Sequence, residues 1–121
     1  KKFFLKYGFE VVDQIEDYEL LSLSFNHQKP FFCKSVKQMM IDSNHITIYY
    51  SPQCPFTLNC IHEIKEYIKD CNIQVDFIKI DTLEKAKNIP CIFNNWAVFK
   101  NGKYVSHILL NKKGFEKLLN D

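Results

Sequence analysis

Nine consecutive residues carry the strongest chemical signal in the sequence. Residues 49–57 read Tyr-Tyr-Ser-Pro-Gln-Cys-Pro-Phe-Thr, which indicates a strand leading into a cysteine and then a helix that begins at Pro55. Backbone N–H groups without partners and the positive end of the helix dipole favour a thiolate at a helix N-terminus. Cys54 is therefore the candidate reactive group of this chain.

The residue three positions after Cys54 decides which thiol chemistry is open to it. A dithiol oxidoreductase has its second cysteine at that place, whereas this sequence has Thr57. A single thiolate still attacks disulfides or holds a mixed disulfide, and the Thr57 hydroxyl is expected to hydrogen-bond the Cys54 sulfur. We therefore expect a monothiol site whose partner is a low-molecular-weight thiol or a protein thiol.

The remaining thiols follow neither a zinc-ligand nor a disulfide spacing: Cys33, Cys60, Cys71 and Cys91. Cys60 lies about 240° around the helix from Cys54 and is expected to point away from it, while Cys71 shares the apolar face of that helix. An odd number of cysteines indicates a reducing, cytoplasmic compartment. The four histidines are scattered, so we expect no bound metal.

Composition limits the other functions that the chain can have. With 121 residues, of which 46% are hydrophobic, it has room for one domain and an appendage. Its net charge is only +2 and all its basic residues are lysines, which argues against nucleic-acid or phosphate binding. No apolar run is long enough to span a membrane. The sequence begins at Lys1 without a methionine, so we expect it to be part of a longer protein.

Two segments near the N-terminus predict a β-hairpin. Residues 9–15 and 18–25 are rich in strand-forming side chains and flank a turn at Glu16-Asp17. A short helical end precedes them, and residues 27–44 are interpreted as a linker with a brief helix over 34–41. A lone hairpin leaves strand edges and an apolar face exposed. We therefore expect it to dock on the rest of the chain or to form a homodimer by pairing with a second copy.

After residue 45 the pattern changes to alternating strands and helices. The strands are expected at 46–50, 73–80, 96–99 and 103–109, and the helices at 55–71, 83–87 and 112–119. The last two strands flank Asn101-Gly102, a strong hairpin signal. The order β-α-β-α-β-β-α predicts an α/β three-layer sandwich with helices on both faces of a four-stranded sheet.

Four motifs follow one another along this region: Cys54-Pro55-Phe56-Thr57, Ile80-Asp81-Thr82, Pro90-Cys91 and residues 98–103, Val-Phe-Lys-Asn-Gly-Lys. With the element order, they resemble the thioredoxin-like superfamily, and within it the YoaP-like domain at the C-terminus of some bacterial GNAT acetyltransferases. The N-terminal segment, residues 4–13 and 18–25, looks like the end of a GNAT module.

The resemblance implies three parts: residues 1–26 as the remnant of a GNAT-like module, 27–44 as a linker, and 45–121 as a YoaP-like domain with a thioredoxin-like fold. It also implies a cis peptide bond before Pro90, which would shape a groove beside Cys54, and it would bring Cys91 near Cys54. The catalytic residues implied are Cys54, Thr57, Pro90 and Cys91, and the substrate groove would be lined by Pro55, Phe56 and Ile89.

The function implied is a thiol-dependent redox or thiol-binding accessory of an N-acetyltransferase, whose catalytic module would be a partner. The alternative is a non-catalytic domain that delivers substrate to that enzyme or interacts with it. Acetyl-CoA sites of GNAT enzymes use a glycine-rich turn, and the glycines here, Gly8, Gly102 and Gly114, are not clustered. We therefore expect no acetyl-CoA site and no cofactor in this chain.

Overall fold

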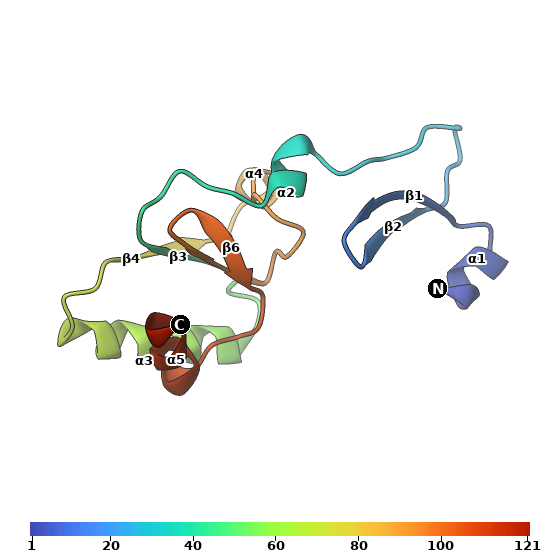
Figure 1. The fold of residues 1–121 in the computed structure, drawn as a ribbon. Coiled ribbons are helices and arrows are strands. Elements are labelled where there is room, and N and C mark those ends of the chain that lie inside the picture. Colours follow the sequence, from blue (N-terminus) through green and yellow to red (C-terminus); the bar gives the residue numbers. More distant parts are fainter.

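The computed structural model describes residues 1–121 and contains a two-stranded and a four-stranded sheet (Figure 1). The elements are α1 (Lys2–Lys6), β1 (Glu10–Ile15), β2 (Tyr18–Ser22), α2 (Lys34–Gln38), β3 (Ile46–Tyr50), α3 (Pro55–Lys69), β4 (Val75–Lys79), α4 (Leu83–Lys87), β5 (Trp96–Lys100), β6 (Lys103–Ser106) and α5 (Lys112–Asn120). From β3 to α5 this is the predicted order of strands and helices. None of the helices combines the length and apolarity needed to cross a bilayer.

The four-stranded sheet has the order β4-β3-β5-β6. Strand β3 pairs in parallel with β4 and antiparallel with β5, and β6 pairs antiparallel with β5. The parallel pair requires a crossover connection, and α3 supplies it. Residues Asn101 and Gly102 both have positive φ values, 51° and 78°, which the tight turn between β5 and β6 requires. The hairpin predicted there is confirmed.

The two faces of this sheet are covered in different ways. Helices α3 and α5 pack on one face, where the largest fully buried side chains of the main cluster are Ile48, Ile64, Val98 and Phe115. The other face carries a smaller cluster of Ile80, Ile89, Cys91, Ala97 and Phe99. Helix α4 contributes no buried residue, so loop segments rather than a packed helix cover this second face.

Part of the predicted linker belongs to the sheet edge. Met40 forms an isolated antiparallel bridge with Lys103, and the N–H of Ile41 donates to the carbonyl of Gly102 at 2.8 Å. An uncovered edge strand presents unpaired backbone groups to solvent. Residues 39–41 therefore satisfy the outer edge of β6.

Several elements end earlier than predicted. Helix α2 stops at Gln38 because Met39 adopts a left-handed conformation, with φ 46°. Strand β6 stops at Ser106, whose hydroxyl accepts a hydrogen bond from the N–H of Ile108 at 3.0 Å and so turns the chain. Strand β2 ends at Ser22.

The N-terminal hairpin touches the rest of the chain mainly through its turn and the adjoining residues. The ring of Tyr18 meets Phe93 edge-on at a centroid distance of 5.2 Å, and Ile15 is buried. Asp13 pairs with Lys37 at 2.7 Å, whereas α1 points away from the four-stranded sheet (Figure 1). The hairpin thus docks on the rest of the chain, which was one of the two expected arrangements. Pairing with a second copy stays a prediction.

Gly102 is the position where a side chain would disturb the sheet most directly. A Cβ there would lie 2.6 Å from the carbonyl oxygen of Ile41, in a backbone conformation with φ +78°. We predict that Gly102→Ala lowers the free energy of unfolding by about 1–3 kcal/mol, measured by urea denaturation. The matched control is Gly114→Ala on α5, where the nearest contact would be the flexible Leu110 side chain at 3.2 Å. It should stay within about 1 kcal/mol of the native chain, and equal losses in both variants would contradict the argument.

Acid should loosen the attachment of the hairpin. The hydrogen bond from Lys37 lowers the pKa of Asp13, and the backbone N–H groups of Phe32 and Gln14 lower it further. Because the folded pKa lies below the unfolded value of about 3.9, the ionised carboxylate stabilises the attachment above about pH 4, and this contribution is lost as the pH falls through the folded pKa. We predict that hydrogen-exchange protection of the Phe32 amide falls in this acid range. In Asp13→Asn the protection should be low at every pH, and acid-independent protection in the native chain would contradict the prediction.

Candidate functional site

The end of β3 positions the cysteine loop. The carbonyl of Tyr50 accepts a hydrogen bond from the N–H of Ile80 at 2.8 Å, and the N–H of Ser51 donates to the carbonyl of Asn95 at 2.9 Å. These bonds tie the residues before the cysteine to the segments that follow β4 and precede β5. Cys54 then stands at the N-cap of α3, and its side chain is exposed.

The first turn of α3 has the predicted local form. Pro55 is at the first helical positions, and the N–H of Thr57 donates to the carbonyl of Cys54 at 3.0 Å. Thr57 is only 5% exposed, whereas Phe56 is 70% exposed. The structure has no hydrogen bond between the Thr57 hydroxyl and the Cys54 sulfur, because the threonine is turned inward while the cysteine faces solvent.

The loop before β5 differs from the expectation at Pro90. The structure contains no cis peptide bond, so the bond before Pro90 is trans, which X–Pro bonds favour by about 0.5–1 kcal/mol unless a turn imposes the other isomer. Ile89 is 3% exposed and Pro90 is also buried. These two residues therefore contribute to the packed interior of the second face rather than to an open groove wall.

Cys91 is a buried thiol. It is 5% exposed, and its sulfur donates to the carbonyl of Phe93 at 3.4 Å. Burial raises the pKa of the Cys91 thiol. All five cysteines are free, and no hydrogen bond joins Cys91 to Cys54. The pairing of these two thiols that the resemblance implies stays a prediction.

Cys60 was expected to point away from Cys54, and the structure makes it a partly buried thiol. Partial burial is the main cause that raises the pKa of Cys60, followed by the charges of Glu63 and Cys54. The two thiols are not bonded. Cys60 is only partly exposed, whereas Cys54 is exposed, so Cys54 is the more accessible thiol of the two.

A groove adjoins the cysteine loop on the side of β4. It has a volume of about 430 Å³ and is lined by Pro52, Gln53, Ile80, Asp81, Thr82, Leu83 and Ala86. These residues follow the carboxyl ends of the parallel strands β3 and β4, which is where open α/β sheets bind ligands. Sequence reasoning missed this groove, although Ile80-Asp81-Thr82 at a strand end was the available signal.

The surface around this groove is apolar with one paired charge. Leu83, which lines the groove, is 71% exposed. No lysine lines the groove, and the nearby Lys85 pairs with Asp81 at 2.6 Å. The hydrogen bond from Lys85 also lowers the pKa of Asp81. The groove therefore offers apolar contacts and no free positive charge for an anionic ligand.

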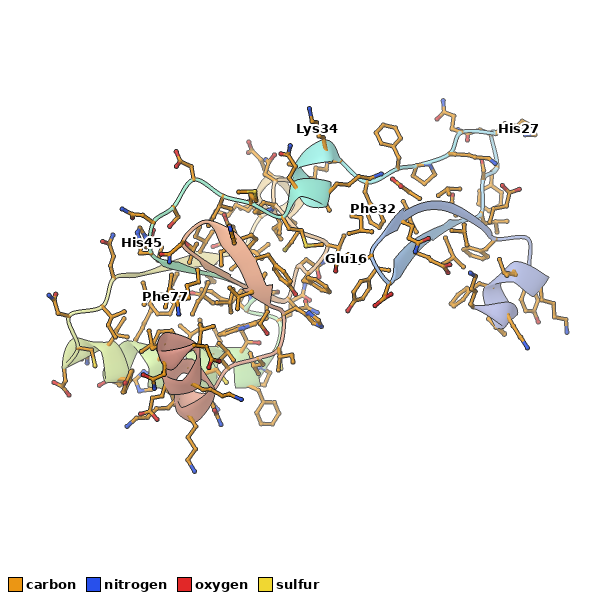
Figure 2. All side chains as sticks on the ribbon, in the orientation of Figure 1. Glu16, His27, Phe32, Lys34, His45 and Phe77 are labelled. Atoms are coloured by element: carbon orange, nitrogen blue, oxygen red, sulfur yellow. The ribbon has the colours of Figure 1, made fainter.

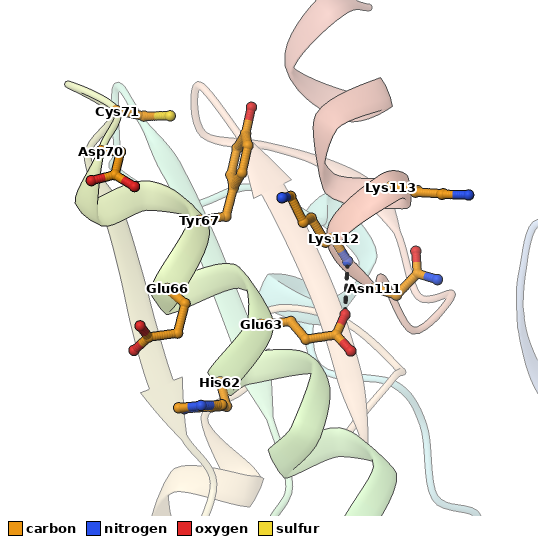
Figure 3. Close-up of a pocket in the computed structure, with 9 residues that line it drawn as sticks. All are labelled: His62, Glu63, Glu66, Tyr67, Asp70, Cys71, Asn111, Lys112 and Lys113. Carbon is orange, nitrogen blue, oxygen red and sulfur yellow. Dashed lines mark hydrogen bonds between the residues drawn. The ribbon is translucent and has the colours of Figure 1, made fainter.

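The largest hollow of the molecule lies elsewhere, between α3 and the start of α5 (Figure 3). It has a volume of about 920 Å³ and most of its lining is charged. The carboxylate of Glu63 accepts a hydrogen bond from the N–H of Lys112 at 3.1 Å, and Asn111 caps the same helix. No group of three or more histidine, cysteine or acidic side chains is placed to hold a metal ion. This hollow is a charged surface without a metal-binding arrangement, so the cysteine loop is the better candidate site.

The reactivity of the thiols should follow their exposure. We predict that iodoacetamide modifies Cys54 at least about tenfold faster than Cys91 in the native protein, because only an accessible thiolate reacts and Cys91 is buried with a raised pKa. Mass spectrometry of the labelled peptides measures both rates in one sample. In denaturant the two rates should converge, and equal rates in the native protein would contradict the assignment.

Comparison with known proteins gives two matches. Residues 74–117 match a family model described as YoaP-like; this segment includes Pro90 and Cys91 but begins after Cys54. The chain is also 35% identical over 123 residues to a protein named "Uncharacterized N-acetyltransferase YoaP" from Bacillus subtilis (strain 168). That match covers 99% of the chain and 49% of the relative, so the chain spans about half the relative's length. No solved structure matches the chain. The two matches support a relation to the YoaP-like family.

Proposed function

We propose that this chain is a YoaP-like unit with a thioredoxin-like fold, that it belongs to an N-acetyltransferase-related protein, and that Cys54 is its redox or thiol-binding group. The observation that carries the proposal is the exposed thiol of Cys54 at the start of α3, beside a groove at the carboxyl ends of two parallel strands. The sheet order β4-β3-β5-β6, with a parallel pair first in the chain and an antiparallel hairpin last, supports the thioredoxin-like part of the proposal.

The proposal divides the chain into residues 1–26 as the end of an acetyltransferase-like module, 27–44 as a connection, and 45–121 as the thiol unit. The name of the curated relative and its greater length support an acetyltransferase module as a partner within a longer protein. Acetyl transfer itself is assigned to that module rather than to this chain. A reducing cytoplasm is proposed as the compartment because all five cysteines are free.

The chemistry proposed is one exchange step at a time. The Cys54 thiolate attacks one sulfur of a disulfide, forms a mixed disulfide with that half, and releases the other half as a thiolate. A second thiol from solution then attacks the mixed disulfide, restores the Cys54 thiolate, and leaves with the bound half as a new disulfide. An external thiol is proposed for this step because Thr57 stands where a dithiol oxidoreductase has its second cysteine and Cys91 is buried.

The groove favours one kind of thiol partner over another. Glutathione carries two carboxylates, which would need positive charges in the groove. The groove has instead the carboxylate of Asp81, and the nearby Lys85 is already paired with it. Leu83 is exposed in the groove, and Phe56 and Leu58 are exposed in the part of α3 that follows Cys54. These side chains suit an apolar peptide segment. We propose a cysteine within a protein, flanked by uncharged residues, as the preferred partner.

The same apolar side chains favour a second candidate function. Phe56 and Leu58 are exposed next to the thiol, and exposed apolar patches often mark protein contacts. In that case the unit would be a non-catalytic domain that delivers substrate to the acetyltransferase module or binds it. Cys54 would then have no redox role.

A disulfide-exchange experiment distinguishes these functions. We predict that the native chain, mixed with a disulfide-linked pair of short apolar cysteinyl peptides, gains its first peptide adduct at Cys54, and that Cys54→Ser gains an adduct at least about tenfold more slowly, both seen in the intact mass. The matched control is Cys33→Ser, which removes another exposed thiol outside the site and should react like the native chain. If Cys54→Ser forms adducts as fast as Cys33→Ser, the redox role is wrong and the interaction domain is the better assignment.

A further inference from the structure

An aromatic cluster stands on the second face of the sheet, apart from the cysteine loop. The rings of Phe93 and His107 stack with a centroid distance of 4.0 Å and an interplanar angle of 9°, and Phe93 also stacks on Tyr104 at 5.5 Å. The phenol oxygen of Tyr104 and Nδ1 of His107 are 2.7 Å apart and share a hydrogen bond. These three residues form one rigid surface, named here the aromatic seat.

The N-terminal hairpin contacts the aromatic seat through the ring of Tyr18. Tyr18 follows the turn at Glu16 and meets Phe93 edge-on at 5.2 Å and His107 at 6.3 Å. Figure 2 shows Glu16 at the end of the hairpin that faces the four-stranded sheet. The hairpin is otherwise held through Asp13, which pairs with Lys37. The contact is therefore small and lies at one end of the hairpin.

A thiol lies directly behind the aromatic seat. The sulfur of Cys91 donates to the backbone carbonyl of Phe93 at 3.4 Å, and Cys91 packs in one cluster with Ile80 and Phe99, against which Phe93 and Tyr104 also pack. Proximity to Cys91 contributes, after burial, to raising the pKa of Tyr104 to about 12. Phe93 is thus bonded to Cys91 through its backbone and packs against the cluster that buries this thiol.

The same cluster reaches the groove beside Cys54. Ile80 is 8% exposed, packs in the cluster of Cys91, and lines the groove. A movement of Phe93 that loosens this cluster would therefore reach a groove wall through side chains in contact. Cooperative local opening of such a unit needs less free energy than global unfolding.

We propose that the hairpin turn is a movable cover for Cys91: with Tyr18 on the aromatic seat the thiol is closed, and when the hairpin leaves the seat the thiol becomes accessible. The attachment is suited to movement because the segment from residue 23 to 33 has no helix or strand and α1 lies away from the four-stranded sheet (Figure 1). A module that precedes the hairpin would then control the accessibility of Cys91. This inference goes beyond the proposed function and does not depend on the reactivity of Cys54.

The test is the alkylation rate of Cys91 in Tyr18→Ala, measured by peptide mass spectrometry on the folded chain. We expect at least about a fivefold increase over the native chain, with the rate at Cys54 unchanged. Tyr7→Ala is the matched control because Tyr7 is an exposed tyrosine on the N-terminal side of the hairpin whose ring contacts Phe3. It should leave the Cys91 rate unchanged, and Tyr18→Phe, which keeps the ring, should do the same.

A second variant keeps the test decisive if Tyr18→Ala does not fold. Asp13→Asn removes the ion pair with Lys37 without altering the aromatic seat, and it should also raise the Cys91 rate while amide protection of β3 stays native. Equal Cys91 rates in Asp13→Asn and Tyr7→Ala would overturn the proposal. The same holds for equal rates in Tyr18→Ala and Tyr7→Ala when both are folded.

Discussion

The structure depends on the double pairing of β3. This strand is bonded to β4 on one side and β5 on the other, and its residues Ile46 and Ile48 are buried. A strand held on both sides cannot slip without turning its buried side chains to the other face. The end of β3 is therefore the best fixed point in the chain, and the bond from Ile80 to Tyr50 ties the next connection to it. The position of Cys54 is fixed because it follows the end of this strand by four residues.

The same sheet gives two thiols opposite environments. Cys54 follows the end of the central strand and faces solvent, whereas Cys91 lies in a cluster on the second face and is shielded by aromatic side chains. That second face has little helical cover, since α4 buries no residue. Loops and the turn of the N-terminal hairpin complete it. The N-terminal hairpin is thus a structural part of the second face of the sheet.

Local features were predictable from the sequence, and long-range ones were not. The helix start at Pro55 and the turn at Asn101-Gly102 depend on the conformations that these residues themselves prefer. The burial of Ile89 and Cys91 depends on how a loop packs against strands distant in sequence, which no local pattern encodes. The bond before Pro90 is trans, the isomer that X–Pro bonds favour by themselves. The groove was missed for the same reason, because two separate strand-to-helix connections form it. The element order, in contrast, followed from periodicity.

We propose that Cys54 and the adjoining groove form one site. Amide chemical shifts of the chain carrying an apolar cysteinyl peptide, disulfide-linked to Cys54, measure whether the peptide occupies the groove. We predict changes at Gln53 and at Ile80–Leu83 and Ala86, which line the groove, beyond those caused by a disulfide to a single cysteine. Changes limited to the surroundings of the disulfide, or centred on the hollow between α3 and α5, would show that the groove does not bind the partner and that the proposal is wrong.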